Sequence, residues 1–512
     1  MGVLMNLLWF LSSVARAVSP FVLLFLVLRW FFRRSENLPP GPRELPFIGS
    51  LPAIVWGLMR RGLQPHHVLG RFAERYGPVF RVNLLNKTVV MLDDFKSTKA
   101  AFQHPQLNDR PPGALGKGVS GTSGEQWIEM RRFCLNVLRS FGVGKSSFEE
   151  KIGAEGEELL KEMSAFQGKP FNPRPPFGSA VSNVICSVVF GKRYDYEDQD
   201  FKRLLALLNK VILSSGTGGI VVFTKGFPRL PFFKSKLKRM RADHADIYAF
   251  IRRIIDSHRS ELDPHNPSDF IDVYLMAVQR NASRNATPTV ANGATAKPEK
   301  YSHLNETNLL YTVNDLFSAG SETTVTTMEW CLLYMAIHPE IQQRVQAEID
   351  AVVGRNRLPR LADKPGLNLT RAVIWEVQRM ASIVPLGLPH VAASDTQFQG
   401  FLIPKDTILV SNLWRINRDP KLWPEPEKFK PERFLNDEGK AFKPEEFIPF
   451  GVGRRICLGE HLAKMELFIF FSYFMHQFTF QKPADAPPYT LEGKSSITFS
   501  PLPFEICAVK RD

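Results

Sequence analysis

A long stretch without proline, from Leu304 to Ile337, constrains the fold of this chain more than any other feature. As a single helix it would measure about 51 Å at the α-helical rise of about 1.5 Å per residue, enough to cross a whole domain. Its middle, residues 318–324 (SAGSETT), is small and polar, and Gly320 weakens a helix interior by about 1 kcal/mol. Two interpretations stay open: a close helix contact at Gly320 beside a satisfied polar cluster, or an opening of the helix over a cofactor.

The composition is that of an ordinary globular protein. The 512 residues are 44% hydrophobic and 23% charged, which excludes collagen, low complexity and disorder for most of the chain. Basic residues outnumber acidic ones, 65 against 51, and the net charge of +14 suits nucleic acid, an acidic protein or an anionic lipid surface. Five widely spaced cysteines without a Cys-x-x-Cys pair favour a reducing compartment over a disulfide framework or a zinc ribbon.

The N-terminus carries an apolar segment, residues 3–32, which is interrupted by Arg16, Pro20 and Arg29. Its two uncharged runs are each shorter than the roughly 20 residues that a spanning helix needs, but together they suffice if Arg16 is tolerated. A cleaved signal peptide is the competing interpretation, although no small-x-small cleavage site follows the run. We therefore expect an uncleaved single-pass anchor over residues 1–34, with the rest of the chain in the cytosol because of the basic flank.

Proline and glycine separate this segment from the remainder of the chain. Residues 38–42 (LPPGP) stop any helix and form a short stiff linker. We therefore expect a proline-rich hinge over residues 35–45 and one catalytic domain over residues 46–512.

The periodicity of that domain predicts a mainly α fold with a small β portion. Residues 79–92 alternate and are rich in β-branched side chains, which indicates two short strands that turn at Asn86-Lys87. Helical patterns dominate after about residue 125. Residues 281–300 are polar and low in aromatics, and we expect a loop there.

The segment with the most chemistry is residues 450–459 (FGVGRRICLG). Its three glycines let the backbone turn tightly and approach a flat ligand. The amides around Cys457, with the start of the following helix, would hydrogen-bond a thiolate and keep it ionised. A thiolate is a strong axial donor to haem iron and favours cleavage of an O–O bond. An isolated cysteine is usually a small core residue, but this frame indicates a ligand.

This segment resembles the haem-binding signature F-x-x-G-x-R-x-C-x-G of the cytochrome P450 family at every fixed position. Other family motifs occur in the expected order: W-x-x-x-R (Trp127 to Arg131), the acid–alcohol motif (Ala319 to Thr324), E-x-x-R (Glu376 to Arg379) and PERF (Pro431 to Phe434). Each motif is weak alone, but the ordered set spans nearly the whole chain. Within the family the sequence resembles the animal microsomal family 2, for example in DLFSAGSETT (315–324) and GFLIPKDT (400–407).

The resemblance implies the cytochrome P450 fold and a haem b cofactor (iron protoporphyrin IX). Cys457 would be the axial ligand of the iron, in the signature that begins at Phe450. The positions that hold the haem propionates are matched by Trp127, Arg131, His390 and Arg455. Arginine suits this role because its planar fork binds carboxylates in a bidentate manner. A core histidine with a backbone partner is the alternative for His390.

The acid–alcohol pair, Glu322 and Thr323, resembles the family's residues that manage protons during oxygen activation. Thr323 has the required hydroxyl, and Glu322 would supply protons from the solvent side. A hydrogen bond from Thr323 to its own i−4 carbonyl is the alternative.

The E-x-x-R residues, Glu376 and Arg379, lie at i and i+3 on one helical face and can meet. In the family they also pair with the PERF arginine, here Arg433, in a structural ion network behind the haem. The alternative is a solvated surface pair, which would contribute under about 1 kcal/mol.

The walls of the substrate pocket are predicted only by their position in the family. They would be Leu115, Val119, Ala319, Ile383, Leu388 and Phe499. These residues are apolar and suit a lipophilic substrate, but an ordinary core would look the same.

The resemblance implies a haem-thiolate monooxygenase of the endoplasmic reticulum membrane. NADPH–cytochrome P450 reductase would supply electrons, cytochrome b5 is a further partner, and one atom of dioxygen would enter a lipophilic substrate. The first alternative is a reductase-independent isomerase or dehydratase that acts on a lipid peroxide with the same haem. The second is a haem-binding protein without turnover.

Two basic features bear on partners. Residues 221–241 interleave lysine, arginine and phenylalanine, a pattern that fits single-stranded nucleic acid or an anionic membrane. The expected anchor favours the membrane, so we expect no nucleic acid, and Pro228 and Pro231 favour a short amphipathic piece or a loop. The basic helix after Trp127 would face the acidic flavin domain of the reductase.

Overall fold

The computed structural model describes residues 37–511 apart from 46–47, 62, 86, 114, 146–147, 215–230 and 287–300, together with residues 2, 18–22 and 25. Most of the expected anchor, residues 1–34, therefore lies outside the described residues. Among those that are described, no helix is both long enough and apolar enough to cross a bilayer.

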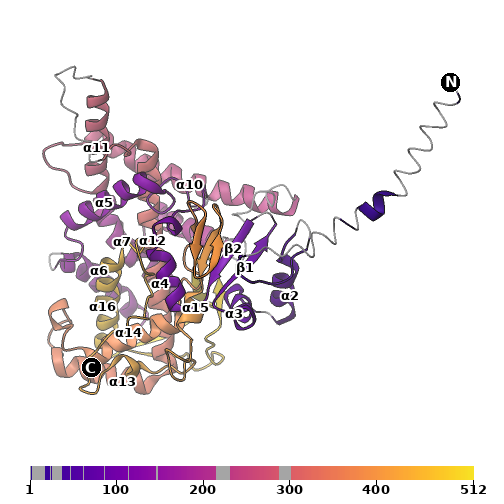
Figure 1. Cartoon of the computed structure of the whole chain (residues 1–512). Helices are drawn as coiled ribbons and strands as arrows, with labels where there is room; N and C mark the ends of the chain where they lie inside the picture. The colour runs from indigo at the N-terminus through magenta and orange to yellow at the C-terminus, as the bar shows by residue number, and fades with distance from the viewer. Residues whose placement is uncertain are drawn as a thin grey trace.

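The described chain is mainly helical. Its α-helices are α2 (Leu51–Arg61), α3 (Pro65–Tyr76), α4 (Phe95–Gln103), α5 (Gly124–Ser140), α6 (Glu149–Ala165), α7 (Arg174–Val189), α8 (Gln199–Ser214), α10 (Pro231–Glu261), α11 (Phe270–Ala286), α12 (Glu306–Ile337), α13 (Pro339–Val353), α14 (Asn368–Ala381), α15 (Leu413–Ile416) and α16 (Glu460–Gln477). In Figure 1 the helices α5, α6, α7, α12 and α16 gather on one side of the molecule. The mainly α expectation is confirmed.

The β portion is small, and its first two strands lie beside α2 and α3 (Figure 1). Four strands form a sheet in the order β1 (Val79–Leu84), β2 (Lys87–Leu92), β6 (Ile408–Ser411) and β3 (His390–Val391). The remaining strands pair two by two: β4 (Thr396–Phe398) with β5 (Phe401–Ile403), β7 (Phe478–Gln481) with β10 (Cys507–Lys510), and β8 (Gly493–Ser495) with β9 (Phe499–Pro501). The antiparallel β1–β2 pair, with Val82 opposite Val89, confirms the two strands predicted over residues 79–92.

Helix α12 confirms the long helix predicted from the absence of proline. It begins after Asn305, whose side chain accepts a hydrogen bond from the Asn308 amide at 3.0 Å, and it ends before Pro339. The helix runs without a break through residues 318–324. A Cβ placed on Gly320 would lie 3.2 Å from the Ile185 side chain of α7, so this glycine makes a close helix contact. The backbone therefore agrees with the interpretation of a close helix contact at Gly320.

Two loop predictions need correction. Residues 281–286 continue α11 as helix, and the Asn281 side chain donates to the Tyr301 carbonyl at 2.7 Å, so only the later part of the polar segment 281–300 lies beyond the helix. The structure does not describe residues 287–300.

The basic segment 221–241 likewise differs from the prediction in its second half. Its residues from Pro231 onward are the first turns of the long helix α10, because proline is favoured at the first position of a helix. Residues 221–230 lie outside the described part, as do the side chains of Phe232 and Phe233.

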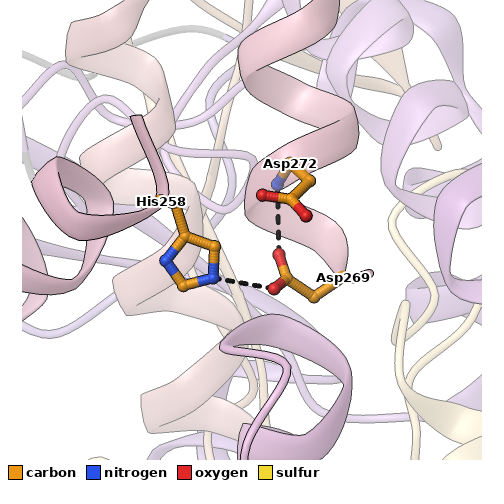
Figure 2. A group of neighbouring side chains, drawn as sticks. All are labelled: His258, Asp269 and Asp272. Carbon is orange, nitrogen blue, oxygen red and sulfur yellow. Dashed lines mark hydrogen bonds and ion pairs between the residues drawn. The ribbon is translucent and has the colours of Figure 1, made fainter. Parts of the chain in front are cut away.

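A buried polar cluster joins α10 to α11 (Figure 2). His258 Nε2 lies 2.7 Å from Asp269 Oδ2, and the Asp272 amide donates to Asp269 Oδ1 at 3.1 Å. His258 Nδ1 lies 2.8 Å from the Ile254 carbonyl, and Ser268 donates to Asp272 through both its amide and its hydroxyl. Asp269 thus caps α11, and these hydrogen bonds explain why the three side chains gather.

Candidate functional site

The Cys457 loop is shaped by its glycines. Gly451 and Gly453 have φ values of 78° and 82°, in the region that favours glycine. A Cβ on Gly453 would lie 2.1 Å from the Phe102 carbonyl oxygen, so no larger residue fits without a shift. The Cys457 amide donates to the Phe450 carbonyl at 2.9 Å, and Gly459 then caps α16. This turn presents the cysteine just before a helix N-terminus.

Cys457 differs from the other cysteines. It is exposed, whereas Cys134, Cys186, Cys331 and Cys507 are buried, and all five are unpaired. The protein that surrounds the sulfur still withdraws it from bulk water, which raises the pKa of the Cys457 thiol. The Gly459 amide and the Arg131 guanidinium act in the opposite direction but do not prevail.

This direction bears on the expected thiolate. Without a metal ion, burial outweighs the Gly459 amide, and the pKa of the Cys457 thiol is raised. A bound metal ion would supply the missing charge, since a coordinating thiol is deprotonated outright. Cys457 therefore fits a metal ligand better than a free reactive thiolate.

A group of cations lies near this loop. Arg131 donates to the Ile456 carbonyl at 2.6 Å. Arg455 donates through Nε to the Asn108 carbonyl and through Nη2 to the Thr122 carbonyl, both at 2.9 Å, and its guanidinium lies 3.9 Å from the centre of the Trp127 ring. Backbone carbonyls therefore fix the side chains of Arg131 and Arg455, two of the residues predicted to hold the haem propionates.

Arg110 joins this group, although the sequence analysis missed it. Its Nη1 donates to the carbonyls of Leu388 and Pro389, at 3.1 and 2.7 Å. The side chain is buried at 6% exposure, which is rare for arginine. The sequence offers only a weak signal, the pair Asp109-Arg110 directly before the uncharged run PPGAL (111–115).

Among the described residues, no carboxylate forms a salt bridge with Arg110, Arg131 or Arg455, although Asp109 acts on Arg455. Burial, then Arg131, lowers the pKa of Arg110 to about 10. Burial, then Arg110, lowers the pKa of Arg455 to about 9, although Asp109 partly offsets this. Nε of Arg110 and Nη1 of Arg455 are buried without a hydrogen-bond partner among the described residues. Such a group fits an anion, because unpaired buried donors are costly and charge-assisted bonds are strong.

His390 is a neutral member of the same neighbourhood. Burial, then Arg110, lowers its pKa well below the ordinary value. Its Nδ1 lies 3.1 Å from the Leu107 carbonyl, and its ring stacks on Phe102 at 3.8 Å between centroids. The alternative interpretation of His390 expected such a backbone partner. Because the Leu107 carbonyl occupies Nδ1, Nε2 can make another contact.

The acid–alcohol pair has two separate environments on α12. The Thr323 hydroxyl donates to the Ala319 carbonyl at 2.7 Å, which is the i−4 bond of the alternative interpretation. Its oxygen still has lone pairs that can accept. Ala319 is exposed although it lies near the helix middle, so α12 borders open space at this turn. Glu322, by contrast, is buried at 5% exposure.

Glu322 is held by Arg174, a residue that the sequence analysis missed. Arg174 Nη2 lies 2.7 Å from each carboxylate oxygen of Glu322, and Nη1 lies 2.6 Å from Glu329 Oε2. Protein surrounds the Glu322 carboxylate, and the expected supply of protons from the solvent side stays a prediction. No local sequence pattern links α7 to the middle of α12, so only tertiary structure reveals this pair.

The E-x-x-R pair is buried rather than solvated. Glu376 and Arg379 are both 0% exposed and share two hydrogen bonds, at 2.7 and 2.8 Å. Arg433 Nε donates to Glu376 at 3.1 Å, and the Lys430 amide donates to the same oxygen at 2.8 Å. Arg379 also donates to the carbonyls of Asn417 and Pro426. The network joins α14 to the turn that precedes the Cys457 loop.

The predicted pocket residues divide by exposure. Leu115, Ile383 and Leu388 are half-buried, Ala319 is exposed, and Val119 is buried. Phe499 is buried as well, and its ring stacks on Trp330 at 5.6 Å, so it belongs to the core at least as much as to a pocket wall. The Phe499 amide donates to the Ile383 carbonyl at 2.8 Å, which brings these two distant segments together.

Comparison with known proteins agrees with this site. The cytochrome P450 family model matches residues 39–508. Cytochrome P450 2U1 of Bos taurus is 39% identical over 511 residues, which cover 94% of this chain and 91% of that relative. Cytochrome P450 2J5 of Mus musculus is 39% identical over 512 residues, with 98% and 96% covered, and cytochrome P450 2J2 of Homo sapiens is 37% identical over 486 residues, with 93% and 92% covered.

The chain therefore belongs to the cytochrome P450 family, and these relatives carry family 2 names. It is a cytochrome P450 monooxygenase, an oxidoreductase that uses haem. Cys457 and the arginines around Arg455 fit haem. The iron of haem binds a thiolate, and its two propionate carboxylates need cations.

Proposed function

We propose that this protein inserts one atom of dioxygen into a lipophilic substrate with electrons from NADPH delivered by a flavoprotein reductase. The observation that carries the proposal is the pairing of an exposed Cys457 with Arg110 and Arg455, each of which has a buried nitrogen without a hydrogen-bond partner among the described residues. Haem held there supplies the oxygen-activating chemistry. Cys457 would bind its iron, and Arg110, Trp127, Arg131, His390 and Arg455 would hold its propionates.

The α12 residues have complementary tasks in this proposal. Ala319 and Thr323 border the open space where substrate would lie. The Thr323 hydroxyl donates to the Ala319 carbonyl at 2.7 Å, and it would turn away from this carbonyl to relay a proton toward the haem site. The apolar neighbours Leu115, Ile383 and Leu388 favour a lipophilic substrate and exclude water.

A basic depression supports the reductase part of the proposal. It measures about 390 Å³ and is lined by Trp127, Ile128, Arg131, Arg132, Leu135, Asn136, Arg139 and Arg454. Four arginines in one shallow hollow would steer an acidic flavin domain, and cytochrome b5 would suit the same face. Because Arg131 also contacts Ile456, the hollow adjoins the Cys457 loop.

The membrane location is also part of the proposal: an anchor over residues 1–34, a hinge over 35–45, and a cytosolic domain over 46–512 at the endoplasmic reticulum. The hinge is fixed to the sheet, because the Arg81 amide donates to the Pro40 carbonyl at 2.7 Å. Helix α2 carries exposed apolar side chains, with Trp56 at 66% and Met59 at 80% exposure. Such side chains suit a lipid surface. A contact of the globular part with the membrane, in addition to the anchor, can be tested with the chain without residues 1–37. Flotation with anionic vesicles should show binding, and no binding at low salt would contradict this contact.

The substrate class and the electron source can be tested together. The purified protein is titrated with a panel of fatty acids and steroids, and changes in its haem absorption identify ligands. With reductase, NADPH and a ligand of the panel, we expect oxygenated product. The alternative, an isomerase or dehydratase, predicts turnover of a lipid hydroperoxide without reductase and no NADPH consumption.

A further inference from the structure

One guanidinium bridges two buried carboxylates at the centre of the molecule. Arg174 opens α7, and its Nη2 and Nη1 reach Glu322 and Glu329 on α12 at 2.7 and 2.6 Å. The two acids are seven residues apart, which places them on one face two helical turns apart. They are 5% exposed, whereas the Arg174 side chain is 21% exposed. Arg174 is therefore the edge of the cluster nearest to solvent.

Two threonines also contact Glu322, one on α12 and one in the segment before β9, and Arg174 has a further partner on α8. Thr326 Oγ1 donates to Glu322 Oε1 at 3.1 Å, and Thr498 Oγ1 lies 3.5 Å from the same oxygen. Arg174 Nη2 also donates to Asn209 of α8 at 3.1 Å. Helices α7, α8 and α12 and the segment before β9 are thus linked through the Arg174–Glu322 pair.

The charges leave this cluster with one more acid than base. Burial, opposed by Arg174 and reinforced by Glu322, raises the pKa of Glu329 to about 7. Arg174 and Glu322 are the charged groups that face Glu329. Burial lowers the pKa of Arg174, but Glu329 and Glu322 outweigh it and raise that pKa above its ordinary value. Near neutral pH the cluster can therefore gain or lose one proton while Arg174 stays charged.

We propose that Arg174 is a positioning residue for the monooxygenase reaction, which fixes Glu322 beside Thr323 and joins it to Glu329 as one proton-exchanging unit. The inference rests on the proposed function. Thr323 follows Glu322 directly, so a shift of the Glu322 backbone moves the Thr323 hydroxyl and its bond to the Ala319 carbonyl. Without Arg174, two buried acids lose their common cation, and proton supply to Thr323 becomes mistimed.

The first test measures hydrogen peroxide released per NADPH consumed, in the full-length holoenzyme with reductase. R174Q should raise this ratio severalfold, and R174K, which keeps one charge, should restore part of the coupling. R193Q is the matched control, because Arg193 binds the buried Glu155 of α6 away from α12. An R174Q ratio equal to wild type, or an equal rise in R193Q, would overturn the inference.

The second test does not depend on turnover. Infrared difference spectroscopy follows the protonated carboxyl band with pH, and the wild type minus E329Q difference isolates Glu329 from Asp315 and Glu466, whose pKa values burial raises to about 7 and about 8. In wild type the Glu329 signal should titrate near pH 7. In R174Q it should titrate at clearly higher pH, because the cation that favours the carboxylate is gone. An unmoved midpoint would contradict the link between Arg174 and Glu329.

The two tests also separate this inference from the proposed function. If wild type with reductase consumes no NADPH on any ligand, the proposed function fails, and the positioning role for oxygenation fails with it. If wild type turns over and only the Arg174 predictions fail, the proposed function stands and the positioning role is wrong.

Discussion

The Arg455 guanidinium stacks on Trp127 at 3.9 Å, and two of its three nitrogens bind the carbonyls of Asn108 and Thr122. This relationship joins the cysteine loop to the start of α5 and to the chain that precedes it. The third nitrogen, Nη1, has no protein partner among the described residues. Arg455 is thus oriented by protein on one side and prepared for an anion on the other.

Replacement of Arg455 by Gln should weaken haem retention. Hydrogen bonds to charged groups contribute about 1.5–3 kcal/mol, so haem loss should be at least about tenfold faster. Transfer of haem to an excess of an acceptor apoprotein measures the rate. The neighbour Arg454, which is exposed, provides the control R454Q, and equal rates in both variants would count against a specific role of Arg455.

Replacement of Glu376 by Gln should strongly destabilise the protein. Arg379 and Arg433 would keep their buried charges without the carboxylate that binds both. Breaking such a pair costs about 3–5 kcal/mol, whereas an exposed pair contributes under about 1 kcal/mol. Denaturant unfolding of the holoprotein measures the difference, with E425Q, from the exposed Glu425–Lys428 pair, as the control. Similar losses in both variants would show that the network is not structural.

Replacement of Thr323 by Ala should leave haem and substrate binding intact but release more hydrogen peroxide per NADPH. The hydroxyl that borders the open space is removed, and proton delivery loses its last donor. Thr327 makes the same kind of i−4 bond, to the Thr323 carbonyl at 2.8 Å, but it is buried, so T327A is the matched control. An unchanged peroxide ratio in T323A would refute the proton-delivery role.

The stabilisation by the polar cluster that joins α10 to α11 (His258, Asp269 and Asp272) should depend on pH. Burial lowers the pKa of His258, but its bond to Asp269 outweighs this and raises the pKa to about 8. Because the folded pKa lies above the unfolded one of about 6.5, its stabilisation is complete below pH 6.5 and is lost as the pH rises through about 8. The loss is at most about 2 kcal/mol. H258Q should make the free energy of unfolding nearly independent of pH across this window, whereas the control H265Q, at an exposed site, should not. If the pH dependence of H258Q equals that of wild type, His258 does not stabilise the fold in this way.

Local sequence signals predicted the parts of this protein that are local. The absence of proline predicted α12, alternation predicted β1 and β2, and the glycine frame singled out Cys457. The signals failed where tertiary contacts decide. Arg110 and Arg174 are isolated arginines whose partners lie far away in the sequence, and Glu322 is paired inside the protein rather than open to solvent.

The direction of the Cys457 pKa could not be predicted from the loop alone. The pattern of glycines and the following helix suggested a stabilised thiolate, but burial by the surrounding protein outweighs the Gly459 amide. Similarly, Pro228 and Pro231 predicted a short amphipathic piece or a loop, whereas the segment from Pro231 onward belongs to the long helix α10. In both cases the motif was correct, and the balance of its physical consequences required the packed structure.

The most direct measurement replaces Cys457 by His and records the absorption of the reduced protein under carbon monoxide. Wild type should give the red-shifted band of a thiolate-bound haem. The variant should lose that band and, if it retains haem, show the spectrum of an imidazole ligand. C134S, at a buried cysteine of α5, is the control that should keep the band. A red-shifted band in the Cys457 variant would contradict the assignment of this residue as the axial ligand.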